Sequence, residues 1–269
     1  MQHWNLLRQK WIIRALLVVI GATIFSMPAY SSAIAQPPEP GWELKFNDEF
    51  NGTTLNANKW NTCYWWAPTG CTNKGNEELQ WHQPDDVFVR NGKLHIRARK
   101  RSMNGYEYTS GMISSHDKYA FQYGYAEIRA KLPRGKGLWP AFWMIPQRHN
   151  AWPPEIDVME YVGHDPTRVR MTLHYTTSRG NDKSDADWVG PDFSAGYHTF
   201  AVKWDPNSII WYVDGVERKR YQVYNNIPHE PLYLVANLAV GGTWVAHPDR
   251  TTPFPSHYSI DYIRVWQRK

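Results

Sequence analysis

The amino-acid sequence predicts an all-β protein built as an antiparallel β-sandwich. Apolar residues recur with a period of two in several segments, and Gly, Pro and Asn turns separate these segments. No long stretch after residue 35 has the periodicity of an amphipathic helix. Residues 36–269 contain no repeat or internal linker, and 42% of the chain is hydrophobic, with 15 tryptophans. We therefore expect one domain with a full core.

Individual strands are expected where apolar and polar residues alternate. The pair Ile209–Val213 and Val216–Val223 has the pattern of a β-hairpin, and its connection, Asp214-Gly215, supplies the positive φ values that a two-residue turn needs. Three other segments have one apolar and one polar face, as half-buried strands do: Lys93–Arg99, Tyr123–Lys131 and Tyr258–Trp266.

Residues 1–35 have the features of a secretory signal peptide. An apolar run from Ala15 to Met27 follows three basic residues, and the small residues Ala33 and Ala35 offer a cleavage site. The run is shorter than the roughly 20 residues of a membrane-spanning helix, which favours cleavage over anchoring. We therefore expect the mature chain, residues 36–269, to be secreted or periplasmic, without a stable membrane anchor.

The charge of the chain gives little reason to expect a charged partner. The formal net charge is +5, and the leader holds three of the basic residues and no acidic one, so the mature chain has 5 − 3, or +2. No basic run with interleaved aromatic residues follows, so nucleic acid is not an expected partner.

The chain has two cysteines, Cys63 and Cys71. An exported protein retains disulfides, so their close spacing favours a bridge over two free thiols. Two cysteines alone do not make a zinc site.

Three acidic residues lie within six residues of an apolar, strand-forming run, Glu155-Ile-Asp-Val-Met-Glu160. On a regular strand Glu155 and Asp157 share a face, whereas Glu160 points to the opposite face. A one-residue bulge at Val158-Met159 brings all three to one face. The outer carboxyl groups can then approach the separation of about 5 to 5.5 Å used by retaining glycosidases, although this estimate does not exclude the wider inverting spacing.

This row of acids favours catalysis over two simpler explanations. Three like charges in one row do not all ionise easily, so at least one carboxyl group should keep its proton near neutral pH, as a general acid must. A calcium site built from one strand lacks the six to eight oxygen ligands it needs. A solvated acidic patch does not fit the apolar alternation.

Six further segments resemble those of one enzyme family, in the same order along the chain. They are Asn76–Gln80, Ser110–Ser114, Tyr123–Arg129, Gly137–Pro146, Asn237–Gly242 and Ile260–Trp266. Together with the acid row they resemble glycoside hydrolase family 16, over about residues 41–267. The resemblance implies a jelly roll of two stacked sheets whose concave face is an open glycan cleft. Gly137–Trp143 and Glu155–Gly163 look most like bacterial endo-β-1,3-glucanases of the laminarinase type.

The resemblance implies a retaining mechanism with two glutamates. Glu155 matches the nucleophile that forms the glycosyl-enzyme intermediate, and Glu160 matches the acid that protonates the leaving oxygen and then activates water. Asp157, between them, would tune both carboxyl groups. This scheme requires no redox cofactor and no catalytic metal.

Four residues are expected to bind substrate. Trp139 and Trp143 share a face of a strand-like segment and match the family segment before the active strand, which favours stacking on sugar rings over core packing. Asn76 matches a residue that touches a sugar hydroxyl. His174 matches a family histidine, although a structural histidine is nearly as good an explanation. The sequence does not separate binding from packing for five other tryptophans: Trp65, Trp66, Trp152, Trp188 and Trp244.

The resemblance also implies a structural calcium ion on the convex side, away from the acids, held by backbone oxygens and one aspartate. The matching positions are Glu49, Gly92 and Asp261. A salt bridge explains an acid at Asp261 almost as well.

The sequence thus predicts a monomeric, endo-acting β-glycanase for β-1,3- or mixed β-1,3/1,4-glucan. A neutral substrate is favoured because the segments next to the acids contain no Lys or Arg, with only Arg148 between them. A bacterial exopolysaccharide glycanase of the succinoglycan type and a transglycosylase are the alternatives. A glycan-binding β-sandwich without activity would have no use for three mutually repelling carboxylates.

Overall fold

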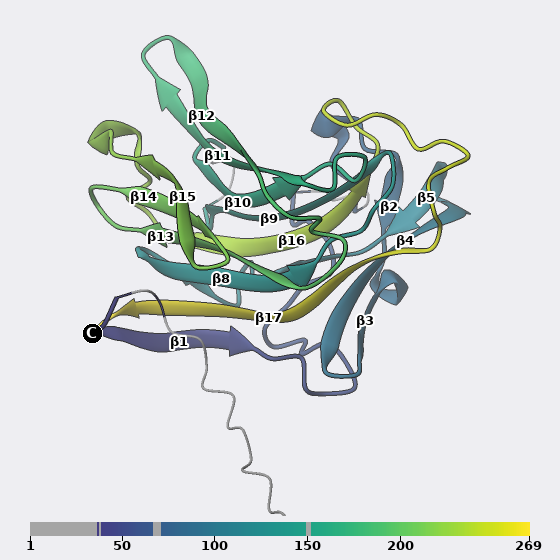
Figure 1. Cartoon of the computed structure of the whole chain (residues 1–269), viewed down its shortest axis with the longest axis horizontal. Coiled ribbons are helices and arrows are strands. Elements are labelled where there is room, and N and C mark those ends of the chain that lie inside the picture. Colours follow the sequence, from purple (N-terminus) through teal and green to yellow (C-terminus); the bar gives the residue numbers. More distant parts are fainter. Residues whose placement is uncertain (1–36, 38, 67–70, 149–151) are drawn as a thin grey trace, which may run out of the picture. The chain divides into compact units, whose positions relative to one another are not determined.

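The structure, a computed structural model, describes residues 37, 39–66, 71–148 and 152–269, and the expected leader lies outside these residues. Residues 36–269 form one unit. Its strands form two stacked sheets, with β8 and β17 in the lower layer of Figure 1 and β9, β10 and β16 in the upper layer. Among the described residues, no helix is long and apolar enough to cross a membrane.

The larger sheet has ten strands in the order β15-β14-β13-β8-β17-β4-β5-β2, with β1 beside β17 and β3 beside β4. All the pairings of this sheet are antiparallel except that of β2 with β5. The strands are β1 (Trp42–Asp48), β2 (Gln80–His82), β3 (Val87–Arg90), β4 (Lys93–Met103), β5 (Tyr106–Ser110), β8 (Gly124–Lys131), β13 (His198–Trp204), β14 (Ile209–Val213), β15 (Val216–Tyr221) and β17 (Ser256–Arg268).

The smaller sheet has seven antiparallel strands in the order β12-β11-β10-β9-β16-β6, with β7 beside β16. Its strands are β6 (Met112–Ser114), β7 (Ala120–Phe121), β9 (Leu138–Pro146), β10 (Glu155–Tyr161), β11 (Arg168–Thr177), β12 (Gly180–Val189) and β16 (Leu232–Val240). Three short 3-10 helices connect strands: η1 (Lys74–Asn76), η2 (Pro84–Asp86) and η3 (Tyr224–Asn226).

The predicted antiparallel β-sandwich is confirmed, and so are the segments on which it was based. The three alternating segments are β4, β8 and β17. The predicted hairpin is β14–β15, and its turn residues Asp214 and Gly215 have φ values of 51° and 74°. The second strand of the hairpin ends at Tyr221, two residues earlier than expected.

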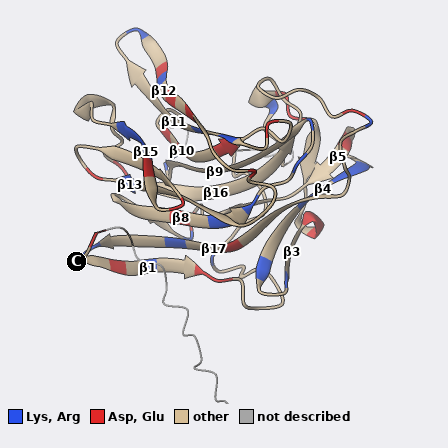
Figure 2. Cartoon of the chain, in the orientation of Figure 1, with Lys and Arg blue, Asp and Glu red and all other residues tan. Residues whose placement is uncertain are grey.

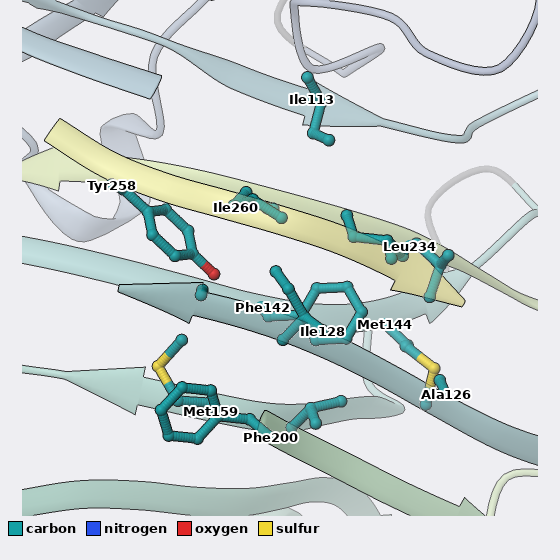
Figure 3. Packing of buried hydrophobic residues seen from close by; sticks show 14 of the residues in the cluster. Ile113, Ala126, Ile128, Phe142, Met144, Met159, Phe200, Leu234, Tyr258 and Ile260 are labelled. Atoms are coloured by element: carbon teal, nitrogen blue, oxygen red, sulfur yellow. The ribbon is translucent and has the colours of Figure 1, made fainter. Parts of the chain in front are cut away.

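The core lies between the two sheets and follows the alternation of each strand. On β9 the even-numbered residues Phe142 and Met144 are fully buried against the larger sheet, while Trp139 and Trp143 point to the opposite face. In Figure 3, Phe142 and Met144 lie close to Ile128 of β8 in this interlayer. The smaller sheet therefore has a second, partly exposed face that is free to form a site.

The predicted bulge in β10 is confirmed by the register of its neighbours. Asp157 pairs with Thr172 and Glu160 with Arg170, so a three-residue step on β10 faces a two-residue step on β11. Both residues of the bulge, Val158 and Met159, are buried in the core. Because two consecutive side chains turn inward, the parity of the strand changes and Glu160 returns to the face of Asp157.

A tryptophan of the larger sheet stabilises this bulge by a hydrogen bond to its backbone. The buried indole N–H of Trp211, on β14, donates a hydrogen bond of 2.8 Å to the carbonyl oxygen of Asp157. Lys219, on β15, lies over the Trp211 ring at 4.4 Å and donates to the carbonyl of Met171 on β11 at 3.0 Å. A buried carbonyl without a partner costs free energy, so the indole stabilises the bulged backbone.

We predict that Trp211→Phe lowers the free energy of unfolding by about 1–3 kcal/mol, because the carbonyl of Asp157 loses its donor. It should also speed amide exchange at Val158 and Met159, measured by NMR. Trp204→Phe is the matched control, since its buried indole donates to the carbonyl of Pro228 at 3.1 Å, away from β10. Equal exchange at the bulge in both variants would contradict the assigned role of Trp211.

Candidate active site

The exposed face of the smaller sheet forms a cleft of about 720 Å³. Its floor consists of side chains from β9, β10, β11 and β16, and loops supply its walls. The structure places all seven residues expected for catalysis and substrate binding in its lining: Asn76, Trp139, Trp143, Glu155, Asp157, Glu160 and His174.

At one end of the acid row, Glu155 and Asp157 face a histidine. His174 pairs with Glu155 across β10 and β11. Its Nε2 atom lies 3.2 Å from Oδ2 of Asp157 and 3.8 Å from Oε1 of Glu155. The other Glu155 oxygen, Oε2, accepts a hydrogen bond of 3.0 Å from the indole of Trp152. These contacts hold the Glu155 carboxyl group in one orientation.

The other end of the row has a guanidinium group. Arg170 pairs with Glu160 in the register of β11, and its Nε and Nη2 atoms donate to Asp187 at 2.7 and 3.0 Å. Thr172 donates to Oε2 of Glu160 at 3.4 Å. Arg170 therefore has a fixed position beside Glu160, since two hydrogen bonds from a planar group leave it little freedom.

Burial and mutual repulsion raise the pKa of both glutamates. Loss of solvent, followed by the charges of Asp157 and Glu160, raises the pKa of Glu155 well above its usual range. Loss of solvent and the charge of Asp157 do the same to the pKa of Glu160, while Trp139, Arg170 and Thr172 act in the opposite direction. Burial and crowding thus both favour the protonated form of these carboxyl groups.

Aromatic side chains flank the acid row. Trp143, which pairs with Asp157, has its ring 6.2 Å from that of Trp66. Trp139 lies beyond Glu160 on β9, and its ring is 5.2 Å from that of Trp244. Flat apolar surfaces beside polar acids suit sugar rings, which have apolar faces and polar edges.

The structure separates the five tryptophans whose roles the sequence left open. The cleft lining includes Trp65, Trp66, Trp152 and Trp244. Trp188 instead packs against Phe193 and lies under the guanidinium of Arg218 at 3.9 Å. The strand pattern did not reveal this difference, because it depends on how the loops fold over the sheet.

Two amide side chains of the cleft lining, those of Asn76 and Asn237, have fixed orientations. Asn76 donates from Nδ2 to the buried carboxyl group of Glu78 at 3.1 Å, which orients its amide. Asn237, on β16, accepts a 2.8 Å hydrogen bond from the indole of Trp143. The sequence reasoning did not single out Asn237 as a site residue, although its parity with Val235 and Ala239 could have indicated it.

Cys63 and Cys71 form a disulfide in the structure, with their Cα atoms 4.9 Å apart. The loop that they close contains Trp65 and Trp66, which line the cleft. The bridge therefore restrains a segment that contributes to the site wall.

Two of the positions expected to hold calcium have carboxylates with cationic partners. Asp261 accepts hydrogen bonds from Lys93, at 2.9 Å, and from Arg129. Glu49 accepts two from Arg264, at 2.8 and 2.7 Å. Cationic side chains thus neutralise both carboxylates, and calcium would need six to eight oxygen ligands in all. A structural calcium ion at these positions stays a prediction.

Two cations in the cleft were missed because they come from neighbouring strands. Arg170 and Lys183 lie on β11 and β12, outside the segments next to the acids. Both have acidic partners: Arg170 binds Asp187, and Lys183 lies 3.2 Å from Asp185. Figure 2 shows basic and acidic residues interspersed on this part of the sheet. The cleft therefore has little free positive charge.

A β-sandwich with a row of three acids in an aromatic cleft is the architecture of a glycan-processing protein. The family model for glycosyl hydrolases family 16 matches residues 73–264, and the chain belongs to this family.

Relatives of known structure and activity support the assignment. The chain is 36% identical to an endo-1,3-1,4-beta-glycanase of Rhizobium meliloti over 82% of its length and 51% of the relative's. It is 34% identical to a beta-glucanase of Rhodothermus marinus, over 85% of this chain and 86% of the relative. The structure of an endo-beta-1,3-glucanase from Pyrococcus furiosus matches with a TM-score of 0.77 and 36% identity, over 85% of this chain and 95% of that one. The chain thus spans only about half of the Rhizobium relative.

We predict that Arg170→Gln moves the basic limb of the pH profile of kcat/KM to higher pH. Arg170 lowers the pKa of Glu160, so its removal keeps the acid protonated to higher pH. Arg170→Lys should give a smaller shift, because it retains the charge.

Arg168→Gln is the matched control for this experiment. Arg168 also contacts Asp187, at 3.4 Å, but lies two residues along β11 from Arg170, the residue that pairs with Glu160. Its removal should leave the basic limb in place. An equal shift in both variants would mean that the field of Asp187, and not Arg170, sets the profile.

Proposed function

We propose that the protein is an endo-acting, retaining β-glycanase that hydrolyses β-1,3- or mixed β-1,3/1,4-glucan. The observation that carries the proposal is the row of Glu155, Asp157 and Glu160 on a bulged strand in the floor of an aromatic cleft. The names of the relatives from Rhizobium meliloti and Pyrococcus furiosus support the glucan linkages. An open cleft suits internal cleavage of a long chain.

In the proposed mechanism the two glutamates have separate roles. The Glu155 carboxylate attacks the anomeric carbon while Glu160 gives its proton to the departing glycosidic oxygen. Glu160, now ionised, removes a proton from water, which hydrolyses the glycosyl ester and releases Glu155. The Trp152 indole donates to Glu155 and acts against the rise of its pKa, while burial and then the charge of Asp157 raise the pKa of Glu160, as a general acid requires.

The electrostatics of the cleft support a neutral substrate. Among the described residues, three cations line the cleft, and each has an acidic partner. Arg148 binds Glu230 at 2.5 and 2.9 Å, Arg170 binds Asp187, and Lys183 binds Asp185. A sulfated galactan would need cations that are free to bind sulfate at several positions. Neutral glucan needs none.

We also propose that the protein acts outside the cytoplasm as a monomer. The composition of residues 1–35 and the disulfide between Cys63 and Cys71 support export.

We predict that Glu155→Gln and Glu160→Gln each reduce kcat by at least about 10³-fold while the fold is kept, because each removes one obligatory step. Azide should rescue Glu155→Ala as the α-glycosyl azide and Glu160→Ala as the β-glycosyl azide. Glu217→Gln is the control, since this glutamate pairs with Arg220 outside the cleft. Initial release of the α-anomer by the unaltered enzyme, seen by NMR, would show inversion and overturn both roles.

The substrate is tested with a panel of polysaccharides. Laminarin and lichenan should yield short oligosaccharides early, as internal cleavage does, whereas carrageenan and agarose should remain intact. Rapid depolymerisation of succinoglycan, with both glucans untouched, would move the assignment to exopolysaccharide glycanases. Longer products than the starting chains would indicate a transglycosylase. Tight glucan binding without any product would indicate a binding module.

A further inference from the structure

We propose that Glu155, Asp157 and His174 form a binding site for a transition-metal dication of the Zn²⁺ type, and that its occupation blocks the cleft. Among the residues that the structure describes, these three offer the one group of three ligand atoms that lie within 4.8 Å of one another. The metal site itself does not depend on the proposed glucanase function. The expected inhibition by the bound ion does depend on the proposed glucanase function.

The spacing of the three atoms fits a small tetrahedral ion. Zn²⁺ holds nitrogen and oxygen ligands at about 2.0 to 2.2 Å, which places two ligand atoms about 3.3 to 3.6 Å apart. Nε2 of His174 lies 3.2 Å from Oδ2 of Asp157 and 3.8 Å from Oε1 of Glu155. Small side-chain movements therefore bring all three atoms to bonding distance.

A second observation concerns Oδ2 of Asp157, whose side chain is only 4% exposed. This buried oxygen has no hydrogen bond of good geometry from any described residue, and it contacts Nε2 of His174 at 3.2 Å. A buried carboxylate oxygen normally has a partner. The histidine nitrogen beside it and the open cleft in front of it provide the second ligand and the entry path of an ion.

Trp152 contacts two of the three ligand residues and orients them, as residues around the ligands do in known metal sites. The Trp152 indole holds Oε2 of Glu155, which leaves Oε1 turned toward His174. The Trp152 and His174 rings lie 5.8 Å apart and limit the movement of the imidazole. Such outer contacts commonly change metal affinity by about 10–100-fold.

The ligand types select the class of ion. One imidazole and two carboxylates suit Zn²⁺, Co²⁺ and Cu²⁺ better than Mg²⁺ or Ca²⁺, which prefer oxygen ligands alone. All three residues line the cleft, so water from the cleft could supply a fourth ligand. An ion bound to Oε1 of Glu155 would occupy the electron pair that attacks the anomeric carbon, so it should compete with substrate.

Titration of the metal-free protein with Co²⁺ tests the site without any substrate. We expect one Co²⁺ per chain and the visible absorption band of a four-coordinate ion, with displacement by Zn²⁺ followed by calorimetry. His174→Ala should abolish the band and weaken Zn²⁺ binding at least about tenfold. Zn²⁺ should inhibit hydrolysis competitively. Both cysteines are in the disulfide, so a thiol does not account for binding.

His198→Ala is the matched control, because His198 also pairs with a carboxylate, that of Asp214 at 2.8 Å, outside the cleft. It should bind Co²⁺ as the unaltered protein does. Absence of binding at millimolar Co²⁺ and Zn²⁺, or binding that survives His174→Ala, would overturn the site. Since the band is read without substrate, a chain that binds Co²⁺ but cleaves no glucan would refute only the proposed function.

Discussion

The single extra residue in β10 is the constraint on which the site depends. Without the bulge, Glu160 would point into the core between the sheets, where a carboxyl group has no partner. With it, Val158 and Met159 both turn inward, and the three acids lie on the cleft face. The core accepts the two inward side chains, and the indole of Trp211 satisfies the carbonyl of Asp157. The packing of the far sheet therefore sets the geometry of the acids.

The smaller sheet works as a two-sided layer. Its inner face packs against the larger sheet, and its outer face carries the acids, the tryptophans and Asn237. Successive side chains of each strand point to opposite faces, so the strands that form the core also hold the site residues in place. A rigid sheet holds polar side chains with less freedom than loops do, which suits groups that must meet one reacting atom.

The close spacing of the three acids destabilises their ionised forms, and the same effect supplies the protonated carboxyl group that a general acid needs. Burial raises the pKa of Glu155 and of Glu160, and Asp157 adds repulsion to both. Hydrogen bonds from Trp152 and Thr172, and the fixed Arg170, limit this cost at the two ends of the row. The same crowding leaves His174 and Oδ2 of Asp157 facing each other, which is the feature that suits a metal ion.

The sequence by itself determined the β class, the β14–β15 turn, the bulge and the face of the acid row, because period and parity are local properties of a strand. Only the tertiary structure decided which groups meet these acids. Arg170 and Lys183 reach the cleft through strand pairing, and the partners of Asp261 come from β4 and β8. These contacts depend on strand order and register, which long-range packing sets and which no segment contains on its own.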